Sequence, residues 1–185
     1  VLLVLLTGCS RVEVVKLPIT TSSQEALEYY KEAEKLLGLN VGEGPEIRAL
    51  LDSAIGLDPN FAMALEMYPT DDQLLEREYK EKAKKLSNKI TESERKILSI
   101  RESYRSGDMD AALEGAVWLV ENHEDSYESH LMLGLVQSDR REHDEAISSL
   151  NKSLDLNPNN YKANYLLMGH HIGLGGQSML PEENR

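Results

Sequence analysis

Residues 127–160 read YESHLMLGLVQSDRREHDEAISSLNKSLDLNPNN and carry the clearest structural signal in the chain. Apolar residues recur there at spacings of three and four, which is the period of an amphipathic helix. Small residues, Gly134 and Ala146, are placed where two helices could cross closely, and the larger Leu133 and Leu150 could fill the space beside them. The stretch therefore predicts two antiparallel helices, ended by the Asn-Pro pair at Pro158.

This 34-residue unit resembles the tetratricopeptide repeat (TPR). Counted in that repeat, Gly134 takes position 8, Ala146 position 20, Leu150 position 24 and Pro158 position 32. The unit departs from the family pattern where Trp, Tyr and Ala are usual, since His130, Gln137 and Ser153 stand there. The resemblance implies an all-α fold, in which antiparallel helix pairs stack as a TPR-type right-handed α-solenoid with a concave surface.

The same frame extends in both directions from this unit. Shifted back by one repeat it covers residues 93–126, where Ala112 and Ala116 take the packing positions. Shifted forward it begins a partial unit, 161–172. We therefore expect TPR units over 91–172 (93–126, 127–160 and the partial 161–172), irregular TPR-like helices over 23–90, and an irregular or truncated tail over 173–185.

Local signals divide the N-terminal half into helices. Ser22-x-x-Glu25 and Thr91-x-x-Glu94 are capping boxes, and Pro69 is expected to break one helix just before another begins at Asp71-Asp72. No segment alternates with a period of two over the length of a strand, so no sheet is expected.

The chain opens VLLVLLTGCS, and Leu6-Thr7-Gly8-Cys9 resembles the bacterial lipobox. In that family a diacylglycerol is attached to the Cys thiol, the signal peptide is cut before the Cys and the new amine is acylated. The resemblance implies that residues 1–8 are the remnant of a signal peptide and that 9–22 form a lipidated Cys9 and an extended tether. Since Met and a basic segment are missing at the start, we expect the chain to be a fragment.

The resemblance also implies a location. The lipid on Cys9 would be the chain's link to the membrane of a bacterial cell envelope. Ser10 follows Cys9, where an Asp would favour retention in the inner membrane, so the outer membrane, with the domain facing the periplasm, is expected. A soluble repeat protein with an incidental apolar start is the alternative.

Composition argues against several other functions. The net charge of −12 disfavours nucleic acid as a partner, and one cysteine excludes a Cys-based zinc site. The five histidines form no metal-binding spacing, and no phosphate-binding or nucleophile motif occurs. We therefore expect no enzyme activity, no cofactor, no metal and no small-molecule substrate.

The remaining candidate is the concave face, which in TPR proteins is lined from repeat positions 2, 5, 9, 12 and 13. The resemblance places at those positions Glu94, Ile97, Arg101, Tyr104 and Arg105 in one unit, Glu128, Leu131, Leu135, Ser138 and Asp139 in the next, and then Lys162 and Tyr165. The predicted partner-binding set among them is Arg101, Tyr104, Arg105, Leu131, Leu135, Ser138 and Tyr165. Arg101 and Arg105 are four residues apart and are predicted to point to one side of a helix. They would favour an acidic–apolar peptide or helix, while the family's chaperone-tail clamp is not reproduced.

The expected function is a non-catalytic, membrane-anchored scaffold for a protein or peptide partner. Two alternatives stay open. The repeats could be the accessory or regulatory region of a larger enzyme or signalling protein. Binding could also use the Lys-rich helix of residues 76–89, because residues 71–105 carry ten of the chain's twenty basic residues.

Overall fold

The computed structural model describes residues 14–39 and 44–178, with side chains over 14–37 and 44–170. Within those ranges the regular secondary structure is helical, apart from one isolated parallel bridge between Val15 and Ser126. The elements are α1 (Gln24–Leu39), α2 (Gly44–Leu57), α3 (Ala62–Met67), α4 (Gln73–Lys85), the short 3-10 helix η1 (Ser87–Lys89), α5 (Glu92–Ser106), α6 (Met109–Asn122), α7 (Tyr127–Asp139), α8 (His143–Leu156) and α9 (Tyr161–Ser178). The expected all-α fold is confirmed.

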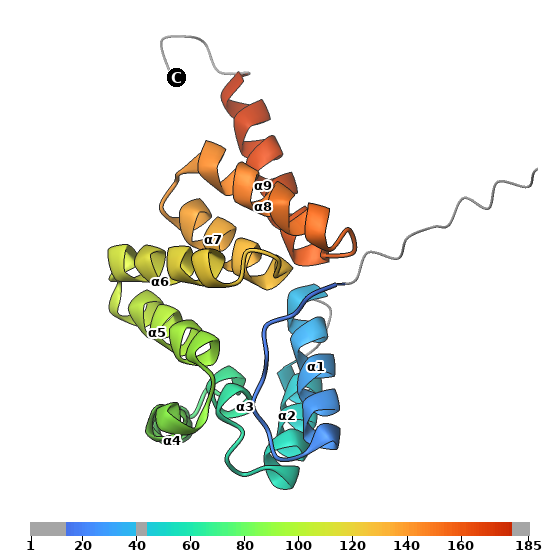
Figure 1. The fold of residues 1–185 in the computed structure, drawn as a ribbon, viewed down its shortest axis with the longest axis vertical. Coiled ribbons are helices and arrows are strands. Elements are labelled where there is room, and N and C mark those ends of the chain that lie inside the picture. The colour runs from blue at the N-terminus through green and yellow to red at the C-terminus, as the bar shows by residue number, and fades with distance from the viewer. Residues whose placement is uncertain (1–13, 40–43, 179–185) are drawn as a thin grey trace, which may run out of the picture.

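The two strongest predicted units form two helix pairs, α5–α6 and α7–α8, which stack on one another (Figure 1). In the second pair Gly134 of α7 lies against Leu150 and the backbone of Ala146 in α8. Ala112, Ala116, Ala146 and Leu150 are fully buried. The predicted packing positions therefore do place small residues where the helices cross, and the chain is built from TPR-type helix pairs.

The N-terminal half begins with a further antiparallel pair, α1–α2. Helix α1 starts at Gln24 and is capped by Ser23, whose hydroxyl accepts a hydrogen bond from the Ala26 amide. The capping box predicted at Ser22 is therefore wrong. The Ser22 amide instead donates to Asp58. Downstream, α3 ends before Pro69 as predicted, and Asp72 caps α4.

The predicted start of α5 is confirmed in detail. Thr91 and Glu94 form a complete capping box, and Gly107 ends the helix in the left-handed conformation. The C-terminal boundary is different, since α9 continues to Ser178 instead of ending near residue 172. Each glycine inside a helix costs only about 1 kcal/mol relative to alanine, and no proline occurs between Tyr161 and Pro181 to stop α9.

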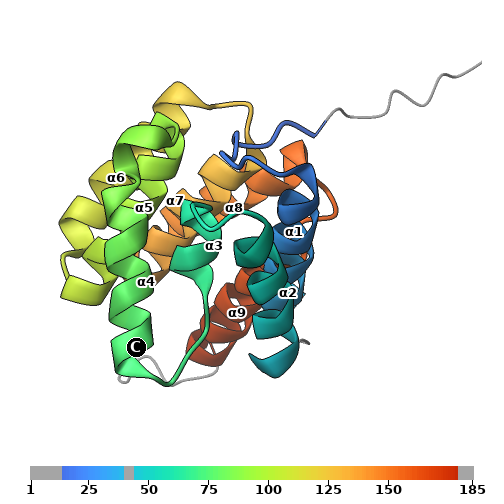
Figure 2. The same ribbon diagram turned by 90° about the horizontal axis from the view of Figure 1, so that it is seen from below.

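The row of helices curves until its first and last described helices meet. The Tyr161 hydroxyl, at the start of α9, donates to the backbone carbonyl of Lys35 in α1 at 2.8 Å, across 126 residues of sequence. Seen from below, α1 and α2 lie on one side, α5 and α6 on the other, and α7 to α9 between them (Figure 2). The concave face is therefore walled on opposite sides by α1 and by the later helices.

Residues 14–22, here called the strap, are extended but do not form a free tether. Leu17 is 6% exposed and packs in the cluster that contains Ile100, Leu119 and Val136. Hydrogen bonds hold the strap to Asp58, Glu94 and Glu128, which belong to three later segments. The predicted tether is therefore wrong for these residues, because an apolar side chain and several backbone amides find partners on the helices.

Candidate binding groove on the concave face

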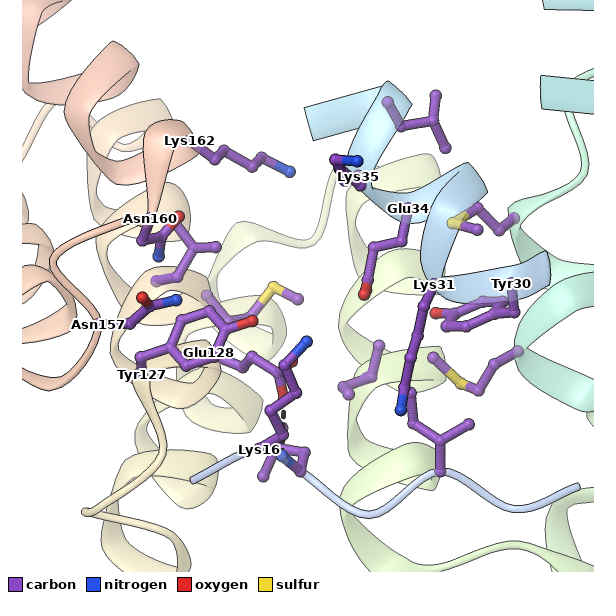
Figure 3. Close-up of a pocket in the computed structure, with 18 of the residues that line it drawn as sticks. Lys16, Tyr30, Lys31, Glu34, Lys35, Tyr127, Glu128, Asn157, Asn160 and Lys162 are labelled. Carbon is purple, nitrogen blue, oxygen red and sulfur yellow. Dashed lines mark hydrogen bonds between the residues drawn. The ribbon is translucent and has the colours of Figure 1, made fainter. Parts of the chain in front are cut away.

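The concave face holds a groove of about 730 Å³. One wall is α1, with Lys31, Glu34 and Lys35 (Figure 3). The opposite wall is built from the loop before α9 and the starts of α7 and α9, and includes Glu128 and Lys162. The strap crosses the open end between them, so three segments far apart in sequence enclose one space.

Two carboxylates of the groove bind the strap. Glu128 accepts a hydrogen bond from the Leu17 amide at 2.7 Å. Glu94, fully buried, accepts from both the amide and the hydroxyl of Thr20, at 2.8 and 2.6 Å, while also closing the capping box of α5. These acids therefore fix the course of the strap, since each meets donors of the extended backbone.

The burial of Glu128 has an electrostatic consequence. Burial raises the pKa of its carboxyl group above the usual range, and the nearby Glu34 raises it further, although the hydrogen bond from Leu17 acts in the opposite direction. The proton is thus held more tightly in the folded protein than in the unfolded chain.

Besides Lys16, Lys31 and Lys35, the groove is lined by Arg101 and Lys162, whose charges affect each other. Burial lowers the pKa of the Lys162 ammonium, and the positive charge of Arg101 lowers it further, while Glu34 acts in the opposite direction. Among the described residues neither Arg101 nor Lys162 forms an ion pair or hydrogen bond. Arg101 and Lys162 are therefore close enough to repel each other in the groove, and neither is hydrogen-bonded to a carboxylate of the described residues.

The predicted binding set divides between this groove and other places. Arg101, Leu131 and Leu135 line the groove, together with Ile97. Tyr104 packs against the core around Ile100 instead, where burial raises the pKa of its hydroxyl. Repeat positions 2, 5 and 9 thus contribute to the groove in α5 and α7, and positions 12 and 13 do not.

Two further predicted residues also lie outside the groove. Ser138 donates to the carbonyl of Gly134 at 2.7 Å and contacts His170 Nε2 at the same distance. Tyr165 is 62% exposed on α9 and does not line the groove. Neither side chain is positioned beside Arg101.

Arg101 and Arg105 do not line the same groove, contrary to the predicted arrangement. Arg105 donates to Glu66 at 2.6 Å and to Glu102 at 2.7 Å, in a second recess of about 740 Å³ between α4 and α5. The Glu66 side chain, on α3, is only 4% exposed, so it draws Arg105 away from the groove. The spacing of four residues could not reveal this because the competing acid is on another element.

Sequence reasoning missed the wall formed by α1 and the strap. Neither belongs to the strong repeats, so no repeat position pointed to them. The sequence did predict residues of the opposite wall: Glu94, Glu128 and Lys162 follow each other at intervals of 34 residues, all at repeat position 2. This regular interval brings them to the same face.

Over 14–39 and 44–178 no three or more His, Cys, Asp or Glu side chains lie where they could hold a metal ion. No helix in those ranges is both long enough and apolar enough to cross a bilayer. Cys9, the predicted lipid attachment residue, lies outside the described residues.

Comparison with known proteins gave only distant similarities. No protein-family model and no curated protein matches the chain. Among solved structures, YrrB is described as a TPR protein with an unusual peptide-binding site. It is 21% identical to this chain, the match covers 81% of this chain and 78% of the YrrB chain, and the TM-score is 0.45. The first TPR of Spaghetti (RPAP3), bound to the HSP90 peptide SRMEEVD, is 14% identical to this chain. The match covers 85% of this chain and 99% of the Spaghetti chain, with a TM-score of 0.38. These values are too low to carry a functional argument, so the TPR-type fold rests on the packing of the helix pairs themselves.

Proposed function

We propose that this chain is a non-catalytic interaction scaffold that binds a carboxylate-bearing peptide or helix of a partner protein in the groove. The observation that supports this proposal is the pair of cations, Arg101 and Lys162, which face the groove without a bonded carboxylate. A carboxylate between them would relieve their mutual repulsion and replace water with charge-assisted hydrogen bonds.

The apolar side of the groove supports a peptide as the ligand. Leu131 and Leu135 lie one turn apart on α7, and Ile97 faces them from α5. Apolar side chains of a bound segment would lose water-exposed area against these three residues. The groove thus combines an anion-binding part with an apolar part, which suits a segment that alternates acidic and aliphatic residues.

The test uses two synthetic peptides with the same leucines, one carrying glutamates and the other glutamines. Fluorescence anisotropy should detect binding of the glutamate peptide, which added salt weakens. Arg101→Glu with Lys162→Glu should weaken it by about tenfold or more, equivalent to about 1.4 kcal/mol. Equal affinity for the two peptides would contradict the proposal.

A matched control carries the same change of charge elsewhere. Lys85 and Lys89 are exposed and lie outside the groove, at the end of α4 and in η1. Lys85→Glu with Lys89→Glu should leave binding of the glutamate peptide nearly unchanged. If this pair weakens binding as strongly as the groove pair, the Lys-rich helix is the binding surface or the effect is one of net charge.

The anchoring part of the proposal rests on sequence. We propose that Cys9 carries lipid and holds the domain at a bacterial outer membrane, facing the periplasm. Each buried methylene contributes about 0.8 kcal/mol, so two or three acyl chains would anchor the domain firmly. When the chain is expressed behind a restored signal peptide, labelled palmitate should attach to the wild type and be absent from Cys9→Ser. An unlabelled, soluble wild type would overturn this part.

A further inference from the structure

The strap is bound to the concave face in the way that an extended peptide would be. Its Leu17 and Thr20 amides donate to Glu128 and Glu94. These two acceptors occupy the same repeat position in successive units, and the two donors are three residues apart. Three extended residues span about 10 Å, which is on the order of one helix-to-helix step. The strap therefore runs across the units in register with their repeat.

The strap also anchors itself by side chains. Leu17 is buried in the core cluster with Ile100 and Leu119, whereas Val14 remains exposed. At the other end the Thr21 hydroxyl donates to Asp58 at 2.7 Å. Between the anchors stands Pro18, which has no amide hydrogen and whose ring restricts the backbone, so fewer conformations are lost on docking.

From this geometry we propose that the strap, residues 14–22, is a displaceable internal ligand that sets the charge preference of the groove. When the strap is docked, its amides occupy the carboxylates of Glu94 and Glu128. Lys162, at the same repeat position in the next unit, then remains available with Arg101 to bind a ligand. The groove then selects a carboxylate-bearing partner. With the strap released, two carboxylates are uncovered, and the groove favours an extended segment that supplies amide donors or positive charge.

Release of the strap need not unfold the helices. Residues 14–16 are exposed, and among the side chains of residues 14–22 only Leu17 is buried. Ile19 is partly buried and packs against the core cluster that contains Tyr30 and Met63. A short peripheral segment held by these two apolar side chains and a few hydrogen bonds opens at a lower free energy than the whole domain. This inference rests on the proposed use of the groove by a partner, but docking of the strap can be measured without one.

The experiment uses the full chain with Leu17→Asp, which places a charge in the apolar anchor, and Val14→Asp as its exposed control in the same segment. Amide hydrogen exchange should show Leu17 and Thr20 protected in the wild type and in Val14→Asp. In Leu17→Asp the exchange at residue 17 and at Thr20 should accelerate at least tenfold, with the helical circular dichroism retained. A capped synthetic peptide of residues 14–23 should bind Leu17→Asp more tightly than it binds the wild type.

Charge preference is the second readout. Leu17→Asp should lose affinity for the glutamate peptide and gain affinity for a matched lysine peptide, while the synthetic strap should reverse both changes. Unchanged exchange at Thr20, or a synthetic strap that binds the wild type and Leu17→Asp equally, would overturn the inference. Failure of the wild type to bind the glutamate peptide would count against the proposed function, and the strap peptide would still report on docking.

A milder variant tests the same inference even if Leu17→Asp fails to fold. Thr20→Val with Thr21→Val removes the hydroxyl donors to Glu94 and Asp58 and keeps the side-chain shape. The variant should speed exchange at the amide of residue 20 and admit the synthetic strap, with less effect than Leu17→Asp. No change in either measurement would also count against a displaceable strap.

Discussion

Gly134 lies so close to Leu150 that a Cβ atom added to the glycine would stand 2.7 Å from Leu150 Cγ. The neighbouring unit reverses the sizes at its own crossing, where a Cβ at Gly115 would stand 2.7 Å from Ile100 Cγ1. Ile100 and Gly134 occupy the same repeat position. Both pairs, α5–α6 and α7–α8, therefore pack one glycine against one large aliphatic residue, and the glycine lies on α6 in the first pair and on α7 in the second.

Gly134→Ala should lower the free energy of unfolding by about 1–3 kcal/mol, because overpacking a tight crossing forces side chains or backbone to shift. Gly169→Ala is the control, since a Cβ there meets nothing within 4 Å and α9 gains a better helix former. Urea denaturation of the two variants should move the midpoint in opposite directions. Equal stability of Gly134→Ala and the wild type would show that the crossing is looser than described.

Ala146→Glu should be more damaging, at about 4 kcal/mol or more, because it puts a carboxylate into a fully buried position. The adjacent, exposed Glu145→Ala should stay within about 0.5 kcal/mol of the wild type. Thermal melting followed by circular dichroism compares them. A variant Ala146→Glu that melts like the wild type would mean that the repeat frame is misplaced.

Arg105 and Arg101 should differ in their contribution to stability. Arg105→Ala leaves the buried Glu66 carboxylate without its cation and should cost about 1–3 kcal/mol. Arg101→Ala removes no bond within the described residues and should cost less than about 0.5 kcal/mol. Glu66→Gln tests the pairing, since it should reduce the cost of Arg105→Ala in a double-mutant cycle. Independent, additive effects would argue against the pair.

Glu128→Gln should stabilise the protein at neutral pH and have little effect in acid. The pKa of Glu128 is raised in the folded state, so the folded protein binds this proton more tightly than the unfolded chain does. The free energy of unfolding of the wild type therefore falls as pH rises from the ordinary carboxyl pKa to the raised pKa of the folded state. The neutral glutamine avoids this penalty and can still accept the Leu17 amide. Unfolding measured from pH 3 to 7 should show the difference grow with pH, and a constant difference would contradict the assignment.

Asp58 also makes the stability of the protein depend on pH, in the opposite direction to Glu128. Burial raises the pKa of Asp58, but hydrogen bonds from Ser22, Thr21 and Asn60 outweigh it and lower the pKa overall. Its contribution to stability is therefore present above the ordinary carboxyl pKa and is lost as pH falls through the lowered value. Asp58 is unchanged in Glu128→Gln, so its effect cancels when the two proteins are compared.

The amino-acid sequence by itself determined the helices and their pairing. Periodic apolar residues, the capping box at Thr91 and the small residues at Gly134 and Ala146 act over one helix or one pair, so local chemistry was enough to predict them. It also located the side of the groove formed by Arg101, Leu131 and Leu135, because repeat positions keep the same orientation in successive units.

Only the tertiary structure decided which distant segments share the groove. The strap reaches Glu94 and Glu128 across 74 and 111 residues, and α1 meets α9 through Tyr161. Arg105 turned away from the groove because a buried acid on α3 lies beside it. Periodicity records which face of a helix is buried, but not which remote amide or carboxylate will satisfy a polar group there, since that choice depends on packing between elements.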